Sequence, residues 1–278
     1  MIIDFVHHHV RRRYAKFGIA SKRLELTQAS VHYYESLPAD RPTIVLLHGL
    51  GTSSSTWVHV LPHLAKTFHV IAIDLPGFGF SSLPDSDGFF PYNKLQQALR
   101  LIIPKLVNSP FVMLGHSLGG WLAADYAILS NRAVKQIVLI NPAGISYPGV
   151  DEQRRLFDIK DMKSLYVLLN RLWWKYPWYF KVFGPAIFFD LRNRGVPQFV
   201  RTVKEDDFLN DRLTGLQAPV SLIWGKDDKV ISEETVNVLK RLVPRVYVRY
   251  INDCGHVPQL ERPKELIALL DETLKDVS

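Results

Sequence analysis

Short apolar runs alternate along the chain with segments of helical spacing. These runs predict strands at residues 43–47, 68–73, 111–114, 134–140, 220–224 and 246–251, and the run at 43–47 is the clearest, although 134–140 and 246–251 also contain charged residues. Runs that are apolar at successive positions are typical of strands buried on both faces, and a looser alternation at 23–35 predicts an antiparallel pair of strands. Helices are predicted at 56–66, 92–107, 121–130, 233–242 and 263–275, with Pro104 ending or kinking the second. The pattern predicts an α/β fold with a mostly parallel sheet, helices on both faces and chemistry at the carboxyl ends of the strands.

The alternation stops between residues 147 and 211. This stretch is aromatic, helical in spacing and punctuated by Pro and Gly. We interpret it as a helical insertion in a sheet domain that residues 1–146 and 212–278 form together. The sequence contains no internal repeat or low-complexity segment.

The segment from Gly115 to Gly119 reads Gly-His-Ser-Leu-Gly between a predicted strand and a predicted helix. In this context the pattern G-x-S-x-G predicts a sharp turn that presents Ser117 as a nucleophile. The turn also places the backbone N–H of Leu118 at a helix N-terminus, where it can stabilise an oxyanion. A second donor is predicted in the loop at 48–51, through the backbone N–H of Leu50.

A serine hydroxyl needs an adjacent base to take its proton. Among ten histidines, His256 follows a late strand in a loop and is predicted to be this base. The carboxylate that orients it is expected after the strand at 220–224, where Asp227 and Asp228 are both available. The order Ser, Asp, His along the chain favours an α/β-hydrolase. The other histidines are expected in structural roles, with His48 bracing the oxyanion loop, His116 pointing away from Ser117, and surface or helix-packing positions for His32, His59, His63 and His69.

With these motifs the chain resembles the α/β-hydrolase fold family over nearly its whole length. The resemblance rests on residues 48–51, 74–81, 115–120, 224–228 and 255–263. It implies Asp228 as the triad acid, with Asp227 as the fallback, and a cap over the active site formed by residues 147–211. Within the family the chain is most similar, through residues 141–145 and 223–226, to the lipase and esterase branch that includes monoacylglycerol lipases of the ABHD6 type.

The resemblance implies a serine hydrolase that cleaves carboxylic esters of lipid-like or other hydrophobic substrates through an acyl-enzyme, without a metal or organic cofactor. Carbon–carbon bond hydrolases that cleave vinylogous diketones use the same three residue types, so they remain an alternative. A ligand-binding member without turnover is the second alternative. Epoxide hydrolases and haloalkane dehalogenases of this fold have aspartate at the nucleophile position, and Ser117 argues against both.

Aromatic residues crowd one part of the insertion, together with Lys175 and Lys181. They could line an acyl pocket, contact a membrane interface or form a small cap core. The N-terminus carries Ile2, Ile3, Phe5 and Val6 before a basic cluster and is a second candidate for peripheral membrane contact. The aromatic set comprises Trp173, Trp174, Tyr176, Trp178, Tyr179, Phe180, Phe183, Phe188 and Phe189.

Composition narrows the remaining classes. The formal net charge is +7, but the basic residues are scattered outside the N-terminus and no nucleic-acid-binding motif is present, so no nucleic-acid partner is predicted. The single Cys254 excludes an internal disulfide, and the N-terminus lacks the pattern of a signal peptide. We therefore expect a cytoplasmic protein, peripheral on a membrane at most. Three adjacent histidines, His7 to His9, point in different directions on any regular element, so no metal site is predicted.

Overall fold

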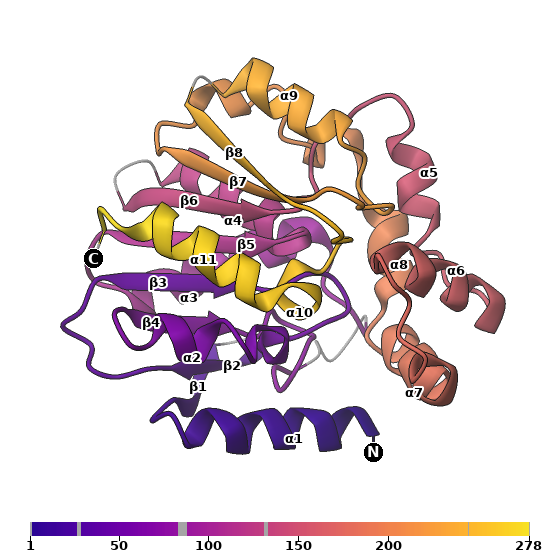
Figure 1. The fold of residues 1–278 in the computed structure, drawn as a ribbon, viewed down its shortest axis with the longest axis horizontal. Coiled ribbons are helices and arrows are strands. Elements are labelled where there is room, and N and C mark those ends of the chain that lie inside the picture. The colour runs from indigo at the N-terminus through magenta and orange to yellow at the C-terminus, as the bar shows by residue number, and fades with distance from the viewer. Residues whose placement is uncertain (1, 27–28, 83–87, 131–132, 244, 278) are drawn as a thin grey trace.

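The computed structural model describes residues 2–26, 29–82, 88–130, 133–243 and 245–277, with side chains described from Val6 onward. One eight-stranded sheet has the order β1-β2-β4-β3-β5-β6-β7-β8 (Figure 1). β1 and β2 pair antiparallel, β2 joins β4 antiparallel, and every later pairing is parallel. The predicted mostly parallel sheet is confirmed. The strands are β1 (Ala20–Leu26), β2 (Ala29–Glu35), β3 (Thr43–Leu47), β4 (His69–Ile73), β5 (Phe111–His116), β6 (Val134–Ile140), β7 (Val220–Gly225) and β8 (Val246–Ile251).

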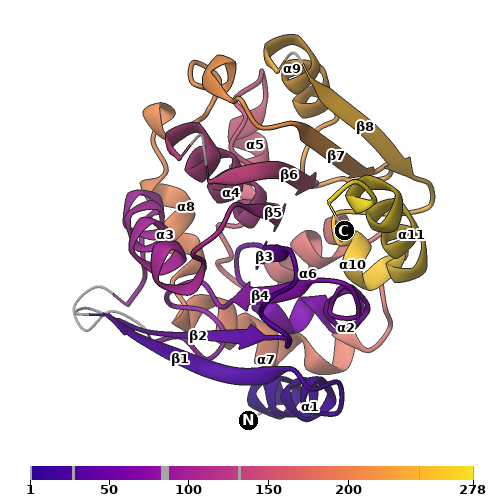
Figure 2. The same ribbon diagram turned by 90° about the vertical axis from the view of Figure 1, so that its left-hand side faces the viewer.

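Helices cover both faces of this sheet, as predicted. α3 (Tyr92–Leu106) and α4 (Leu118–Leu129) lie on one side, whereas α1 (Ile2–Ala15), α2 (Leu61–Leu64) and α11 (Pro263–Leu274) lie on the other (Figure 2). α9 (Glu234–Leu242) precedes β8, and the short α10 (Pro258–Glu261) precedes α11. No helix among the described residues is long and apolar enough to cross a membrane.

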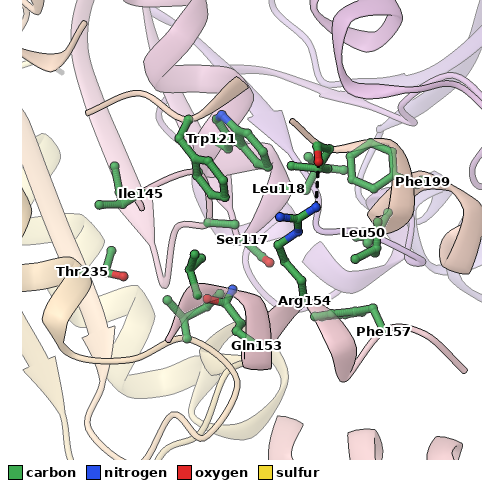
Figure 3. A pocket seen from close by; sticks show the side chains of 17 residues that line it. Leu50, Ser117, Leu118, Trp121, Ile145, Gln153, Arg154, Phe157, Phe199 and Thr235 are labelled. Carbon is green, nitrogen blue, oxygen red and sulfur yellow. Dashed lines mark hydrogen bonds between the residues drawn. The ribbon is translucent and has the colours of Figure 1, made fainter. Parts of the chain in front are cut away.

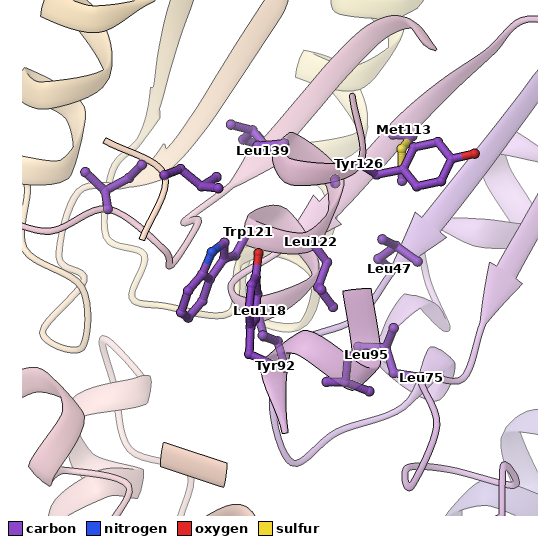
Figure 4. Close-up of a cluster of buried hydrophobic side chains, with 14 of the residues drawn as sticks. Leu47, Leu75, Tyr92, Leu95, Met113, Leu118, Trp121, Leu122, Tyr126 and Leu139 are labelled. Carbon is purple, nitrogen blue, oxygen red and sulfur yellow. The ribbon is translucent and has the colours of Figure 1, made fainter. Parts of the chain in front are cut away.

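Alternate residues of the central strands point to opposite faces of the sheet and pack into two separate hydrophobic cores. On β3, Val45 and Leu47 join the cluster under α3 and α4, whereas Ile44 and Leu46 join the cluster under α2 and α11. All five residues of β3 are buried, which explains why the four that follow Thr43 are all apolar. Figure 4 shows part of the first cluster, packed around α4.

Two helix predictions need correction. The helix expected at 56–66 is a 3₁₀ turn at Ser54–Trp57 followed by the single turn of α2. Pro62 lies in this segment, and a proline lacks the N–H that a continuous helix would need there. At the N-terminus, α1 is a helix that the pattern did not predict. α3 ends at Leu106, two residues after Pro104, as expected.

The segment between β6 and β7 lies beside the carboxyl ends of the strands (Figure 1). It contains α5 (Val150–Arg155), α6 (Met162–Leu172), α7 (Phe180–Asn193) and α8 (Val196–Thr202). Arg194 joins this segment to the core, because its guanidinium donates to the carbonyl oxygen of Gly77 at 3.1 Å. Asp190, one turn earlier in the same segment, holds the guanidinium in place through an ion pair. We refer to residues 147–211 as the cap; the division of the chain at these positions stays a prediction.

Candidate active site

Ser117 occupies a strained turn between β5 and α4. Its backbone has φ 52° and ψ −117°, outside the regions that a serine ordinarily adopts. The flanking glycines are required, because a Cβ at Gly115 would lie 2.2 Å from the carbonyl oxygen of Gly119, and one at Gly119 would lie 2.3 Å from that of Leu47. Close packing of α4 on β3 and β5 therefore fixes Ser117 at the carboxyl end of the sheet.

Two backbone N–H groups next to Ser117 have no acceptor among the described residues. They belong to Leu118, the first residue of α4, and to Leu50, in the loop after β3. Both residues line a cavity together with Ser117. A free N–H at a helix N-terminus favours negative charge nearby, so this pair is suited to an oxyanion.

His48 braces the loop that carries Leu50. Its Nδ1–H donates to the carbonyl oxygen of Gly49 at 2.8 Å, and its Nε2 accepts from the backbone N–H of Leu75 at 2.9 Å. Burial lowers the pKa of His48 to about 4, so the ring is neutral near pH 7. The bracing role predicted for His48 is confirmed.

The structure pairs His256 with Asp228 rather than with Asp227. The His256 Nδ1 atom lies 2.7 Å from Asp228 Oδ2, and both side chains are buried. The other oxygen of Asp228 accepts the backbone N–H groups of Val230 at 2.7 Å and Ile231 at 3.0 Å. Because a carboxylate is an acceptor, Nδ1 carries the proton and Nε2 is free to accept one.

Asn141 is a further member of this network, and the sequence did not predict it. Its Nδ2 donates to Asp228 Oδ2 at 2.5 Å, and its Oδ1 accepts the backbone N–H of Gly225 at 3.0 Å. It is fully buried at the end of β6 with φ 43°, a left-handed conformation that asparagine tolerates better than most residues. An asparagine directly after a buried strand was the available signal.

The loop of His256 is attached to the cap. The backbone N–H of His256 donates to the carbonyl oxygen of Leu172 at 2.8 Å. Glu261 accepts the backbone N–H of Gly255 at 2.9 Å through one carboxylate oxygen and that of Trp174 at 2.7 Å through the other. Burial raises the pKa of Glu261. Glu261 lies within the motif at 255–263, but the motif alone did not predict this contact with the cap.

His116 also contacts the loop that carries His256. Its Nε2–H donates to the backbone carbonyl oxygen of His256 at 2.7 Å, and burial holds its pKa well below the usual range for histidine. Its ring centroid lies 4.9 Å from that of His256. His116 therefore has a structural role, because it holds the backbone of the His256 loop.

The prediction of surface or helix-packing positions was wrong for two strand histidines. His32 on β2 is buried and pairs through Nδ1 with Asp74 at 2.8 Å, and His69 on β4 is buried and contacts Glu35 at 3.0 Å. Hydrogen bonds, with His32 among the donors, lower the pKa of Asp74 to about 2 against the opposing effect of burial. His63 lies nearer the surface and contacts Asp271 at 2.8 Å.

Two apolar cavities meet at Ser117. The smaller cavity measures about 60 Å³ and is lined by Leu50, Leu118, Trp121, Ile145, Phe199 and other residues (Figure 3). The larger cavity measures about 190 Å³ and is lined by His256 together with Leu168, Leu169, Leu172, Trp173 and other residues. In Figure 3 the Ser117 hydroxyl lies near the centre, between Ile145 on one side and Leu50 on the other.

The aromatic residues of the cap lie in three different surroundings, so none of the three expectations describes all of them. Trp173 and Phe180 line the larger cavity, whereas Tyr176 and Phe188 pack against the main hydrophobic core. Trp178 is 75% exposed and Phe189 is 63% exposed. One segment therefore provides cavity lining, packing and an exposed apolar surface.

The described residues contain no cluster of three or more His, Cys, Asp or Glu side chains that could hold a metal ion. His7 contacts Ser53, with Nε2 3.1 Å from the hydroxyl oxygen.

Comparisons with known proteins agree with this geometry. The model of the alpha/beta hydrolase family matches residues 44–269. Mouse (Mus musculus) monoacylglycerol lipase ABHD6 is 25% identical over 273 residues, which cover 88% of this chain and 79% of that protein. Lipase 1 from Psychrobacter immobilis is 27% identical over 242 residues, which cover 83% of this chain and 74% of that protein.

Solved structures share the fold. A bacterial membrane phospholipase A has a TM-score of 0.86 at 23% identity, covering 99% of this chain and 92% of that chain. The 2-hydroxy-6-oxo-6-phenylhexa-2,4-dienoate hydrolase from Rhodococcus sp. strain RHA1 has a TM-score of 0.79 at 20% identity, covering 92% of this chain and 99% of that chain. The family match spans most of the sequence, and the relatives are named lipases. The chain therefore belongs to the alpha/beta hydrolase family, as an enzyme of its lipase and esterase type.

Proposed function

We propose that the chain hydrolyses carboxylic esters of hydrophobic, lipid-like substrates with Ser117 as nucleophile, His256 as general base and Asp228 as the residue that orients His256. One observation carries the proposal: His256, which is buried and paired with Asp228, lines the same apolar cavity as the strained Ser117. In the described structure no hydrogen bond joins the Ser117 hydroxyl to His256. Such bonds often tighten only when substrate is bound.

In the first step, His256 Nε2 takes the proton of Ser117 as Oγ forms a bond to the ester carbonyl carbon. The N–H groups of Leu50 and Leu118 stabilise the negative charge that develops on the carbonyl oxygen. Asp228 stabilises the histidine cation that results. The carbon–oxygen bond to the alcohol then breaks, and the proton held by His256 passes to the departing oxygen.

In the second step, His256 takes a proton from a water molecule as that water attacks the acyl carbon. The same two N–H groups stabilise the second oxyanion. The bond from the acyl carbon to Ser117 then breaks, and His256 returns its proton to the serine oxygen. The products are one carboxylic acid and one alcohol, and Ser117 is regenerated.

The substrate class is supported by the lining of both cavities, which is largely apolar. Hydrophobic groups gain about 0.8 kcal/mol per buried methylene, so such cavities favour apolar esters over small polar ones. The names of the relatives, a monoacylglycerol lipase and a bacterial lipase, point the same way.

Labelling with a fluorophosphonate probe tests the nucleophile. Wild type is expected to be labelled and to hydrolyse short p-nitrophenyl esters, whereas Ser117→Ala loses both. Ser130→Ala, at the other end of α4, is the matched control and should retain both. Failure of folded wild type to react would contradict the proposal and favour a ligand-binding role, and turnover of a vinylogous diketone instead of esters would favour a carbon–carbon bond hydrolase.

We also propose that the outer surface of α6 and α7 contacts anionic lipid. Residues 162–189 contain Lys163, Arg171, Lys175 and Lys181 but no acidic residue. The exposed apolar side chains on the same segment are Val167, Trp178, Tyr179, Val182, Phe183 and Phe189. Apolar side chains flanked by cations are suited to the interface of a negatively charged bilayer. Because α6 and α7 also line the larger cavity, this contact would bring lipid close to the site.

Vesicle co-sedimentation tests the surface. The full chain should bind vesicles that contain phosphatidylglycerol more strongly than pure phosphatidylcholine, and a Trp178→Ser, Phe189→Ser variant should lose that binding. Tyr247→Ser on β8, which is similarly exposed, is the control. Equal binding by both variants would refute this surface. The side chains of Ile2, Ile3 and Phe5 lie outside the described residues, so N-terminal membrane contact stays a prediction, as does the cytoplasmic location.

A further inference from the structure

Ser117 lies where the smaller and the larger cavity join, and a bound ester must place its two halves in different cavities. Leu50, Ser117 and Phe157 line both spaces. The carbonyl carbon has to lie at Ser117, with the acyl chain on one side and the alkoxy oxygen on the other. The positions of the other site residues decide which half enters which cavity.

His256 fixes the direction. Among the described residues, it lines the larger cavity and is absent from the lining of the smaller one. Its Nδ1 is engaged by Asp228, so Nε2 is the nitrogen that must protonate the departing alkoxy oxygen. A general acid has to lie within hydrogen-bond reach of the atom that it protonates. The alkoxy oxygen therefore faces the larger cavity.

Leu118 shows where the acyl half of the ester lies. Its N–H is one of the two proposed oxyanion donors, and it lines the smaller cavity but not the larger one within the part of the chain that the structure describes. With the carbonyl oxygen toward Leu50 and Leu118 and the alkoxy oxygen toward His256, the remaining substituent, the acyl chain, extends into the smaller cavity.

We infer, on the basis of the proposed function, that the larger cavity binds the alcohol half of the substrate and the smaller cavity binds the acyl half. When the carbon–oxygen bond breaks, its electron pair stays on the alkoxy oxygen, which takes the proton from His256, and the alcohol is released into the larger cavity. Because the larger cavity is about 190 Å³ and the smaller is about 60 Å³, the preferred substrates are esters with a short acyl group and a longer apolar alcohol.

The wall of the larger cavity supports a long alkyl group in the alcohol. α6 contributes Leu168, Leu169 and Leu172, and α7 contributes Ile187 and Leu191. Each methylene that such a wall removes from water increases kcat/KM about fourfold. In the smaller cavity, Trp121 is stacked against Phe208 with ring centroids 5.5 Å apart, which closes one side of the space available to an acyl chain.

Isomeric esters provide the test, because they share composition and differ only in which half is long. Octyl acetate and ethyl octanoate are compared with the full chain, and each kcat/KM is divided by the rate constant for hydroxide-catalysed hydrolysis of the same ester. We expect at least a tenfold preference for octyl acetate. A preference for ethyl octanoate, in an enzyme labelled at Ser117, would overturn this inference and leave the proposed function intact.

Two matched variants extend the test. Leu169→Phe narrows the larger cavity and should reduce the ratio of octyl acetate to ethyl octanoate turnover, whereas Ile145→Phe narrows the smaller cavity and should increase it. Both residues are buried cavity lining, and each variant receives a phenyl ring. Fluorophosphonate labelling checks that the active site of each variant is folded. If a variant is not labelled, the ratio of octyl acetate to ethyl octanoate turnover measured with wild type decides the test. Opposite shifts from those stated would overturn the inference, and absence of Ser117 labelling in wild type would overturn it together with the proposed function.

Discussion

Replacing Asn141 by Asp is expected to destabilise the fold in a strongly pH-dependent way. The change removes the N–H that donates to Asp228 at 2.5 Å and puts a second carboxylate in its place. The backbone should remain, because aspartate, like asparagine, tolerates the left-handed conformation of this position. At a separation of about 3 Å and an effective dielectric constant of about 20, two like charges repel by about 5 kcal/mol.

Protonation limits this cost. Holding a proton on a carboxyl group at pH 7, about three units above its ordinary pKa near 4, costs about 4 kcal/mol. Since this is less than the repulsion, the folded variant shares one proton between the two carboxyl groups, and that proton restores a hydrogen bond. The folded state then binds one more proton than the unfolded chain, so stability falls as pH rises. We expect a loss of about 4 kcal/mol relative to wild type at pH 7 and only about 1 kcal/mol at pH 5.

Urea unfolding of wild type and variant between pH 5 and pH 7 measures this difference. The control is the exchange variant Asn141→Asp, Asp228→Asn, which again places one amide opposite one carboxylate. Its cost relative to wild type should be nearly independent of pH. A loss from Asn141→Asp that is equal at pH 5 and pH 7, or a steep pH dependence in the exchange variant, would refute the reasoning.

Three further predictions concern the surroundings of the site. Gly119→Ala should cost at least about 2 kcal/mol in urea unfolding because its methyl would meet the Leu47 carbonyl, whereas Gly215→Ala, whose nearest neighbour lies at 3.8 Å, should be nearly neutral. Wild type should lose stability as pH falls from about 6.5 to about 4, because the unfolded chain protonates His48 first, and unfolding of His48→Gln should show a smaller loss. Glu261→Gln replaces one of the two oxygens that accept the N–H groups of Gly255 and Trp174, and it should lower kcat/KM about tenfold. Steady-state kinetics on a short ester measures this loss, and an unchanged kcat/KM would show that the contact between the His256 loop and the cap is dispensable.

Sequence patterns predicted the sheet well because its central strands are buried on both faces. The run Thr43–Leu47 is apolar at every position after Thr43, and β3 covers those same residues. The turn at Ser117 could also be predicted from the sequence, because the positions on either side have no room for a side chain and are therefore glycines. In both cases the constraint determines the residue type itself, apolar where both faces of a strand are buried and glycine where no side chain fits, so it can be recognised in the sequence.

Contacts between distant segments left weaker traces. His32 lies in an alternating strand, and only the fold brings Asp74 to it; the same holds for Asn141 and Asp228, which are 87 positions apart. The choice of Asp228 over Asp227 came from family resemblance rather than from spacing. Nor could the sequence indicate how the cap aromatics divide, because helical spacing is similar for a residue that lines a cavity and one that faces water.

The attachment of the His256 loop to the cap has a consequence for protein engineering. The cap offers the carbonyl oxygen of Leu172 and the N–H of Trp174 to the loop at 255–261, and both are backbone groups. A chimera that takes its cap from another hydrolase can therefore keep both contacts with other side chains at positions 172 and 174, although Leu172 and Trp173 also line the larger cavity and their replacement would change it. It must preserve the path of that backbone, or the graft will alter catalysis even where it never contacts the substrate.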